Sequence, residues 1–220
     1  MSLFKTLAFA GGDWIIVLLS MTSVLVVAVA LDRAIVLFRE RKLAAVLARD
    51  LPHLFAGGDI DAAQRLVELT GGAVASILSA GLKHRHRGID AMEEHITAAQ
   101  IEVKTWLERR LLILGTLGNN APFVGLFGTV LGVIKAFHDL AVTGGGPEVV
   151  MSGLSEALIA TAVGLLVAIP SVLAFNYFQK RVSDLFTGAE VLVRLLLADL
   201  KSNSNGLTAP RHPVGTASVS

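Results

Sequence analysis

The sequence A-P-F-V-G-L-F-G-T-V-L-G-V-I-K-A-F occupies residues 121–137, and S-E-A-L-I-A-T-A-V-G-L-L-V-A-I-P-S-V-L-A-F-N occupies residues 155–176. Both stretches are apolar, and each carries a single threonine set among glycines and alanines. Small residues of this kind let helix backbones approach closely in lipid. The pattern therefore predicts tightly packed helices around something polar.

The composition indicates a membrane protein. The chain has 220 residues, is 53% hydrophobic and 17% charged, and has a mean hydropathy of +0.66, which is too apolar for an ordinary soluble domain. Segments 14–31, 111–134 and 157–179 contain no Asp, Glu, Lys or Arg, and each approaches the roughly 20 residues that a spanning helix needs. We expect an all-α membrane protein with three transmembrane helices, 14–31, 111–137 and 156–179, and long cytoplasmic helical extensions.

The first span has an alternative interpretation as a secretory signal. Lys5 precedes it, and small residues at 28–30 resemble a cleavage site. However, the apolar run exceeds the usual signal core of about 7–15 residues, and basic residues follow it closely. A retained membrane anchor is therefore favoured.

The basic residues lie at one end of the three spans. By the positive-inside rule, their placement predicts an N-terminus outside the cytoplasm and a C-terminus inside it. The residues concerned are Arg33, Arg39, Arg41, Lys42, Arg109, Arg110, Lys180 and Arg181. The remaining parts are then a short periplasmic N-terminus (1–13), a cytoplasmic helical domain (32–110), a periplasmic loop (138–155), a cytoplasmic C-terminal helix (180–201) and a disordered tail (202–220).

Helical patterns continue outside the spans. Asp90 with Glu93 forms a capping-box-like start, and nothing breaks the helix before the glycines of the second span, which predicts one long helix from about Asp90. The segment after the third span carries an apolar stripe, which indicates a helix face buried against the long helix or a neighbouring subunit. The stripe consists of Leu185, Val191, Leu192, Leu195 and Leu196.

Small residues form one face on each of the last two spans, because they recur at separations of three and four. On the second span these are Gly125, Gly128, Thr129 and Gly132, and on the third they are Ala157, Ala160, Thr161, Gly164 and Ala168. One interpretation is helix packing, with each threonine hydroxyl bonded to its own backbone. The other is that Thr129 and Thr161 offer hydroxyls to a proton or water path. Spacing leaves both open.

Glu156 is an acidic residue at the very start of the third span. An ionisable group there is a functional candidate, although the start of a span also lets it reach interfacial water. Five residues separate Glu156 from Thr161, a rotation of roughly 140°, so the two do not share a helix face. Because the middle of the spans has no titratable residue, any proton carrier there must come from another chain.

Several classes of site are excluded. The absence of cysteine excludes disulfides, iron–sulfur clusters and thiol catalysis, and the formal net charge of +1 gives no basic excess for nucleic acid. His84 and His86 are two residues apart, which does not place them on one helix face for a metal ion. We expect no enzyme activity, no cofactor and no metal.

The residues P-F-V-G-L-F-G-T-V at 122–130 and S-E-A-L-I-A-T-A-V-G-L-L-V-A-I-P at 155–170, followed by Asn176, resemble the ExbB/TolQ proton-channel family, with MotA as a more distant relative. The resemblance implies a multi-pass subunit of a proton-motive-force-driven motor in the bacterial inner membrane. It implies a homo-oligomer, a pentamer, around the helices of an ExbD/TolR-type single-span partner that supplies a membrane aspartate, and work on a TonB/TolA-like energy transducer. Thr129 and Thr161 then fall on the family's pore threonines, and Glu156 on its motif glutamate.

The first motif favours an ExbB-like protein that energises TonB-dependent transport across the outer membrane. Leu131, Lys135 and the short N-terminal segment depart from familiar members. They leave open a TolQ-like subunit for Tol–Pal envelope integrity or a gliding-type motor. A passive membrane scaffold is the alternative from another class, whereas a solute transporter would show more spans or an internal repeat.

Overall fold

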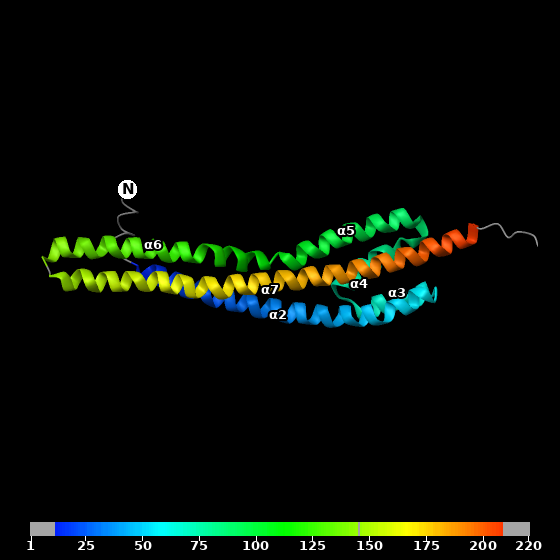
Figure 1. Cartoon of the computed structure of the whole chain (residues 1–220), viewed down its shortest axis with the longest axis horizontal. Coiled ribbons are helices and arrows are strands. Elements are labelled where there is room, and N and C mark those ends of the chain that lie inside the picture. The colour runs from blue at the N-terminus through cyan, green and yellow to red at the C-terminus, as the bar shows by residue number, and fades with distance from the viewer. Residues whose placement is uncertain (1–11, 145, 209–220) are drawn as a thin grey trace, which may run out of the picture. The chain divides into compact units, whose positions relative to one another are not determined.

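The computed structural model describes residues 12–144 and 146–208. Its elements in chain order are α2 (Asp13–Ala56), α3 (Ile60–Thr70), α4 (Gly72–Lys83), the short 3-10 helix η1 (Arg85–Arg87), α5 (Ile89–Glu108), α6 (Leu111–Thr143) and α7 (Pro147–Thr208) (Figure 1). Three helices are long and apolar enough to cross a membrane, within Asp13–Ala56, Leu111–Thr143 and Pro147–Ser202. The expected all-helical fold with three candidate spans is confirmed for the described residues.

The connection between the last two spans differs from the expected loop at 138–155. α6 continues to Thr143 and α7 begins at Pro147, so most of that segment is helical. The physical reason lies in the breakers: Gly144, with φ +62°, supplies the left-handed residue that ends α6, and proline is favoured in the first turn of a helix. Nothing before Gly144 interrupts the helical pattern.

The expected single helix from about Asp90 into the second span is instead two helices. α5 ends at Glu108, a turn occupies residues 109–110, and α6 begins at Leu111. Arg110 at this turn donates from one guanidinium nitrogen to both carboxylate oxygens of Asp32, each at 3.0 Å. This tertiary ion pair holds the chain where local sequence alone predicts continuous helix.

α7 is one helix through the third span and beyond it. The segments expected as a span and as a separate C-terminal helix are continuous, and residues 202–208 of the expected disordered tail are helical. Residues 209–220 of that tail, and residues 1–11 of the expected N-terminal segment, lie outside the described residues.

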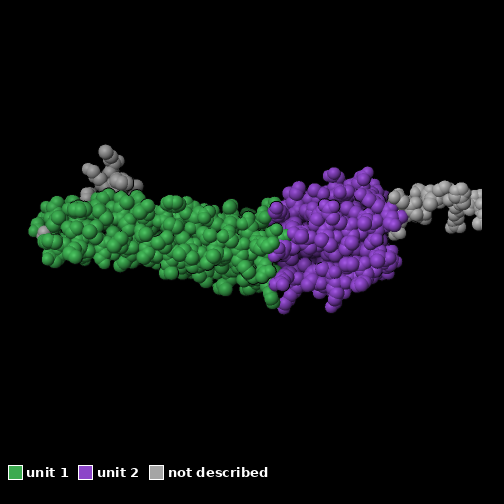
Figure 2. Space-filling view, in the orientation of Figure 1, with its two compact units in different colours: residues 1–38, 105–183 green, residues 39–104, 184–220 purple. Residues whose placement is uncertain are grey.

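The chain divides into two compact units (Figure 2). Among the described residues, unit 1 comprises 12–38 and 105–183, and unit 2 comprises 39–104 and 184–208. Unit 1 therefore contains the charge-free apolar segments of all three candidate spans.

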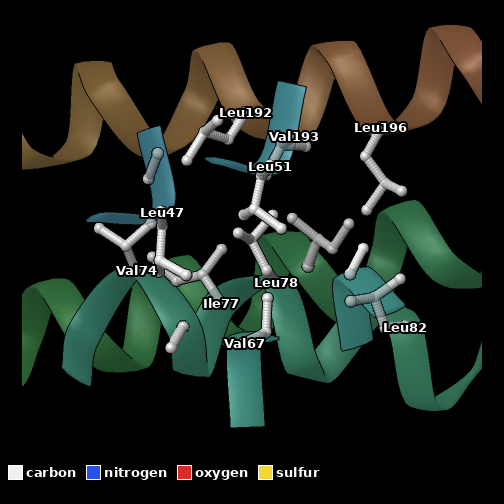
Figure 3. Close-up of a cluster of buried hydrophobic side chains, with 14 of the residues drawn as sticks. Leu47, Leu51, Val67, Val74, Ile77, Leu78, Leu82, Leu192, Val193 and Leu196 are labelled. Carbon is white, nitrogen blue, oxygen red and sulfur yellow. The ribbon is translucent and has the colours of Figure 1, made fainter. Parts of the chain in front are cut away.

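Unit 2 has a buried core of apolar side chains from α2, α3, α4, α5 and α7, part of which Figure 3 shows. Burying each such leucine contributes roughly 1.5–3 kcal/mol. Fully or almost fully buried members include Leu47, Leu51, Val67, Ile77, Leu78, Leu82, Leu192 and Leu196. The apolar stripe expected on α7 is split: Leu185, Leu192 and Leu196 are buried, whereas Val191 and Leu195 are 53% and 40% exposed.

Two carboxylates cap the short helices of unit 2. Asp59 Oδ1 accepts a hydrogen bond from the Ala62 amide at 2.9 Å, which caps α3. Glu40 Oε2, from α2, accepts from the Ala73 amide at 2.6 Å in the first turn of α4. The N-cap of α4 is Gly71, which has no side chain to offer, so Glu40 supplies the acceptor from a distant helix.

Candidate functional site

In unit 1 the small-residue faces of α6 and α7 pack against one another within the same chain. A Cβ atom built at Gly125 would lie 2.8 Å from the Ala160 carbonyl oxygen, and one at Gly132 would lie 2.6 Å from Ala157 Cβ. Both distances are shorter than real Cβ contacts, so the backbones of α6 and α7 can come this close only because glycine has no side chain. The buried small residues of the two faces are Gly125, Gly128, Gly132, Ala157, Ala160, Gly164 and Ala168.

The contacts also set the register of the two helices. Ser171 Oγ donates to the Leu114 carbonyl at 2.9 Å, whereas Gly128, fourteen residues further along α6, faces Ala160. Residue numbers thus rise along α6 as they fall along α7, and the two helices lie antiparallel, side by side (Figure 1). Thr129 and Thr161 each follow one member of the Gly128–Ala160 contact, so they lie at the same level.

The two threonine hydroxyls differ in their hydrogen bonds. Thr129 Oγ1 donates to the Leu126 carbonyl at 2.6 Å, the back-bonding typical of a helical threonine. Thr161 Oγ1 is buried and has no hydrogen-bond partner among the described residues. An unsatisfied buried hydroxyl costs about 1–3 kcal/mol. Folding of this chain alone therefore gives no reason for a hydroxyl at Thr161.

Glu156 lies in a different environment. Its carboxyl group lies beside the Asp13 side chain at the start of α2. It also lines a cavity of ≈ 440 Å³ whose walls include Lys135, Asp139 and Glu148. The structure therefore places Glu156 in a charged surrounding at one end of unit 1.

Asp13 is a candidate that the sequence reasoning missed. It reaches Glu156 because the start of α2 crosses α6 closely: a Cβ at Gly12 would lie 3.3 Å from the Gly128 carbonyl oxygen, and the Ile15 side chain packs on Gly128. No local pattern relates residues this far apart in sequence. The only available signal was a lone carboxylate directly before the first apolar run.

Glu156 and Thr161 are not brought together. Glu156 contacts Asp13 of α2, whereas the Cα atom of Thr161 would lie 3.0 Å from a Cβ atom at Gly125 of α6. On one helix these contacts require different sides, in agreement with the roughly 140° that five residues subtend. The candidate residues therefore form two separate polar places in unit 1.

A third polar cluster was also missed from sequence. Arg33 is only 3% exposed, and its guanidinium pairs with Asp32 at 2.8 Å, while Arg110 pairs with the same carboxylate at 3.0 Å. Burial of an arginine is costly unless it is paired, and Asp32 pairs the buried Arg33. The Arg110–Asp32 pair also connects α2 to the start of α6. As for metal ions, no group of three or more His, Cys, Asp or Glu in the described ranges could hold one.

Comparison with known proteins identifies the chain's relatives. A sequence model of the MotA/TolQ/ExbB proton channel family matches residues 71–190, just over half of the 220 residues. The Tol-Pal system protein TolQ of Pseudomonas aeruginosa is 40% identical in an alignment of 127 residues that covers 52% of this chain and 54% of that protein. The biopolymer transport protein ExbB of Helicobacter pylori is 52% identical over 76 residues, 34% of this chain and 52% of that protein.

A further relative is the biopolymer transport protein ExbB of Aquifex aeolicus, 42% identical over 94 residues, 42% of this chain and 62% of that protein. The chain thus spans about half the length of the curated relatives that it matches. The family match covers both threonines, Glu156 and the α6–α7 packing described above. This membrane protein with three candidate spans therefore belongs to the MotA/TolQ/ExbB proton channel family.

Proposed function

We propose that this protein is an ExbB-like proton-channel subunit of a motor in the bacterial inner membrane. Together with an ExbD-type single-span partner, it uses the proton-motive force to energise TonB-dependent transport across the outer membrane. Membership in the family and the relatives named ExbB support this proposal. The distribution of arginine and lysine supports an orientation with the N-terminus outside and the C-terminus inside.

The observation that carries the proposal is the Thr161 hydroxyl. It is buried without a hydrogen-bond partner among the described residues, at about the level of Thr129, and the Thr161 Cα atom lies against the close-packed face of α6 at Gly125. Such a hydroxyl is ready to bond a water molecule or a group from another chain. Other threonines satisfy the hydroxyl on their own helix, as Thr22 does with the Leu18 carbonyl at 2.8 Å and Thr129 with the Leu126 carbonyl at 2.6 Å, so this support comes from Thr161.

The titratable group must then come from a partner. Segments 111–134 and 157–179 contain no ionisable Asp, Glu, Lys or Arg, so the level of the threonines has no proton carrier of its own. A partner helix with a membrane aspartate supplies one when several copies of this chain, a pentamer, surround it. Thr129 and Thr161 form hydrogen bonds with that carboxyl group, directly or through water. Glu156 takes part in proton entry at the outer end.

A TolQ-like role in Tol–Pal envelope integrity is the second candidate. The alignment with the relative named TolQ covers 52% of this chain, against 34% and 42% for the two ExbB relatives described. Expression in strains lacking ExbB or TolQ separates the two roles. Restored uptake through a TonB-dependent receptor supports the ExbB-like role, whereas restored detergent resistance alone assigns the TolQ-like role.

The test of the proposal is proton flux in proteoliposomes. Vesicles contain this chain alone, the chain with its partner, or the chain with a partner whose membrane aspartate is changed to asparagine. We expect selective flux only with the intact partner. Robust flux through this chain alone would place the carrier within it and contradict the proposal. A passive scaffold would conduct in none of the three.

Valine substitutions test the two threonines, since valine nearly preserves their volume. Thr161→Val with Thr129→Val should abolish flux while native mass spectrometry still counts a complete oligomer. Thr161→Val alone should leave the chain as stable or about 1 kcal/mol more stable, because it removes an unsatisfied hydroxyl. Thr22→Val, a matched change on α2, should leave flux intact. Wild-type flux from the double variant would refute the role of the threonines.

A further inference from the structure

Asn119 of α6 is an exposed amide within the second candidate span. It lies eight residues after Leu111, about 12 Å along the helix axis, and sixteen residues before Lys135, about 24 Å. Since the hydrocarbon core of a bilayer is about 30 Å thick, Asn119 is inside it. An amide that finds no hydrogen-bond partner there is strongly destabilising.

The neighbouring amide provides a contrast. Asn120 is also exposed, but its Nδ2 donates to the Thr116 carbonyl of its own helix at 2.7 Å. The Asn119 side chain has no hydrogen-bond partner among the described residues. Consecutive helical residues point about 100° apart, so the two amides face different surroundings. Asn119 therefore has to be satisfied from outside the chain, whereas Asn120 is partly satisfied within it.

The Asn119 side chain points to a side of α6 not far from that of Thr129. Ten residues separate Asn119 from Thr129, which corresponds to about 15 Å along α6 and a rotation of only about 80°. On α7, Asn176 follows Thr161 by fifteen residues, a rotation of about 60°, and is likewise exposed. Phe175 packs on Gly115, which places Asn176 roughly 7 Å nearer the Leu111 end of α6 than Asn119.

Asn119 and Asn176 thus lie on the same side of the antiparallel α6–α7 pair as Thr129 and Thr161, between the two threonines and the end of the pair that carries Arg110 and Lys180. We propose that Asn119 lines a water-filled inner half of the proton path, one level below Thr129 and Thr161 and one level above Asn176. Its amide donates to and accepts from water in that space, which satisfies it without lipid contact. The inference rests on the proposed function for its role in conduction, but the aqueous exposure of Asn119 can be measured without it.

Substituted-cysteine labelling tests this placement, because the chain has no cysteine of its own. Asn119→Cys, Asn120→Cys and the α2 variant Val24→Cys, at a position 70% exposed within the first span, are assembled as full-length oligomers in vesicles. A charged, membrane-impermeant thiol reagent is applied to each side in turn. We expect Asn119→Cys to react at least about ten times faster than both controls, from the side that carries Lys180. Equal rates in all three variants would overturn the proposal.

Flux with the partner supplies the second measurement. Asn119→Leu should reduce proton flux several-fold, while Asn120→Leu, the same change one residue away, should leave it near the wild-type value with an unchanged oligomer. Equal flux in the two leucine variants would also overturn the proposal. If the chain fails to conduct at all, the labelling rates still decide whether Asn119 faces water, so failure of the proposed function is distinguishable from failure of this inference.

Discussion

Replacing Gly125 by alanine should separate α6 from α7. The new Cβ atom would lie 2.8 Å from the Ala160 carbonyl oxygen and 3.0 Å from the Thr161 Cα atom, and both neighbours are backbone that cannot rotate away. Ordinary contact needs about 3.5–4.0 Å, so the helices must move apart by roughly 0.5–1 Å. A gap of that size forfeits a quarter to a half of each nearby dispersion contact.

The free energy of unfolding should fall accordingly. Overpacking costs about 1–3 kcal/mol, and the higher helix propensity of alanine returns about 1 kcal/mol, which leaves a net loss of up to about 2 kcal/mol. Gly188→Ala is the matched control on α7, because a Cβ atom there meets no atom within 4 Å. That variant should gain up to about 1 kcal/mol.

Unfolding can be followed by far-ultraviolet circular dichroism as a denaturing detergent is titrated into micelles, at one protein concentration so that assembly contributes equally. Because both variants gain the same helix propensity, they should differ by the overpacking cost of about 1–3 kcal/mol, with Gly125→Ala the less stable. If Gly125→Ala is as stable as Gly188→Ala, the α6–α7 contact does not depend on close backbone approach.

Three smaller changes test other contacts. Glu40→Ala removes the acceptor 2.6 Å from the Ala73 amide and should cost about 1–2 kcal/mol, with faster hydrogen exchange confined to the first turn of α4; unchanged exchange there would contradict the cap. Ser171→Ala removes a buried hydrogen bond and should cost about 1 kcal/mol in detergent unfolding, with no loss if the bond is absent in the membrane. The hydrogen bond from Arg85 lowers the pKa of Asp61 below 3.8, so its stabilisation is complete above that value and is lost as the pH falls through the lowered pKa. Arg85→Gln should therefore be less stable than the wild type at pH 6 and equal to it in strong acid, and a difference that persists in acid would exclude this ion pair as its source.

The elements that the sequence predicts well are those written in local patterns. Three charge-free apolar runs indicate helices, because a helix satisfies all of its backbone hydrogen bonds within one segment in lipid. Glycines and alanines at separations of three and four predict a close-packed face on each of the last two spans, and contacts such as Gly132 with Ala157 have that character. The resemblance to the ExbB/TolQ family is confirmed by the family match over residues 71–190.

The remainder depends on contacts between distant segments. No local signal tells whether a small-residue face packs against another copy or against the same chain. In this structure the faces of α6 and α7 pack against each other within one chain. The turn at 109–110 coincides with the Arg110–Asp32 pair, and the Asp13–Glu156 pair exists because α2 crosses α6 at Gly128. Spacing alone likewise left the threonines undecided, because a hydroxyl's partner depends on small rotations within a packed interface.

The separation between Glu156 and Thr161 constrains how a proton would travel in the proposed motor. Five residues place them about 7.5 Å apart along α7 but about 140° apart around it, and the side chain of Glu156 is held toward Asp13. A proton released at Glu156 therefore cannot pass directly to the threonine level along this chain. In the proposed motor, a partner carboxyl group that reaches both places in turn would carry the proton across this separation.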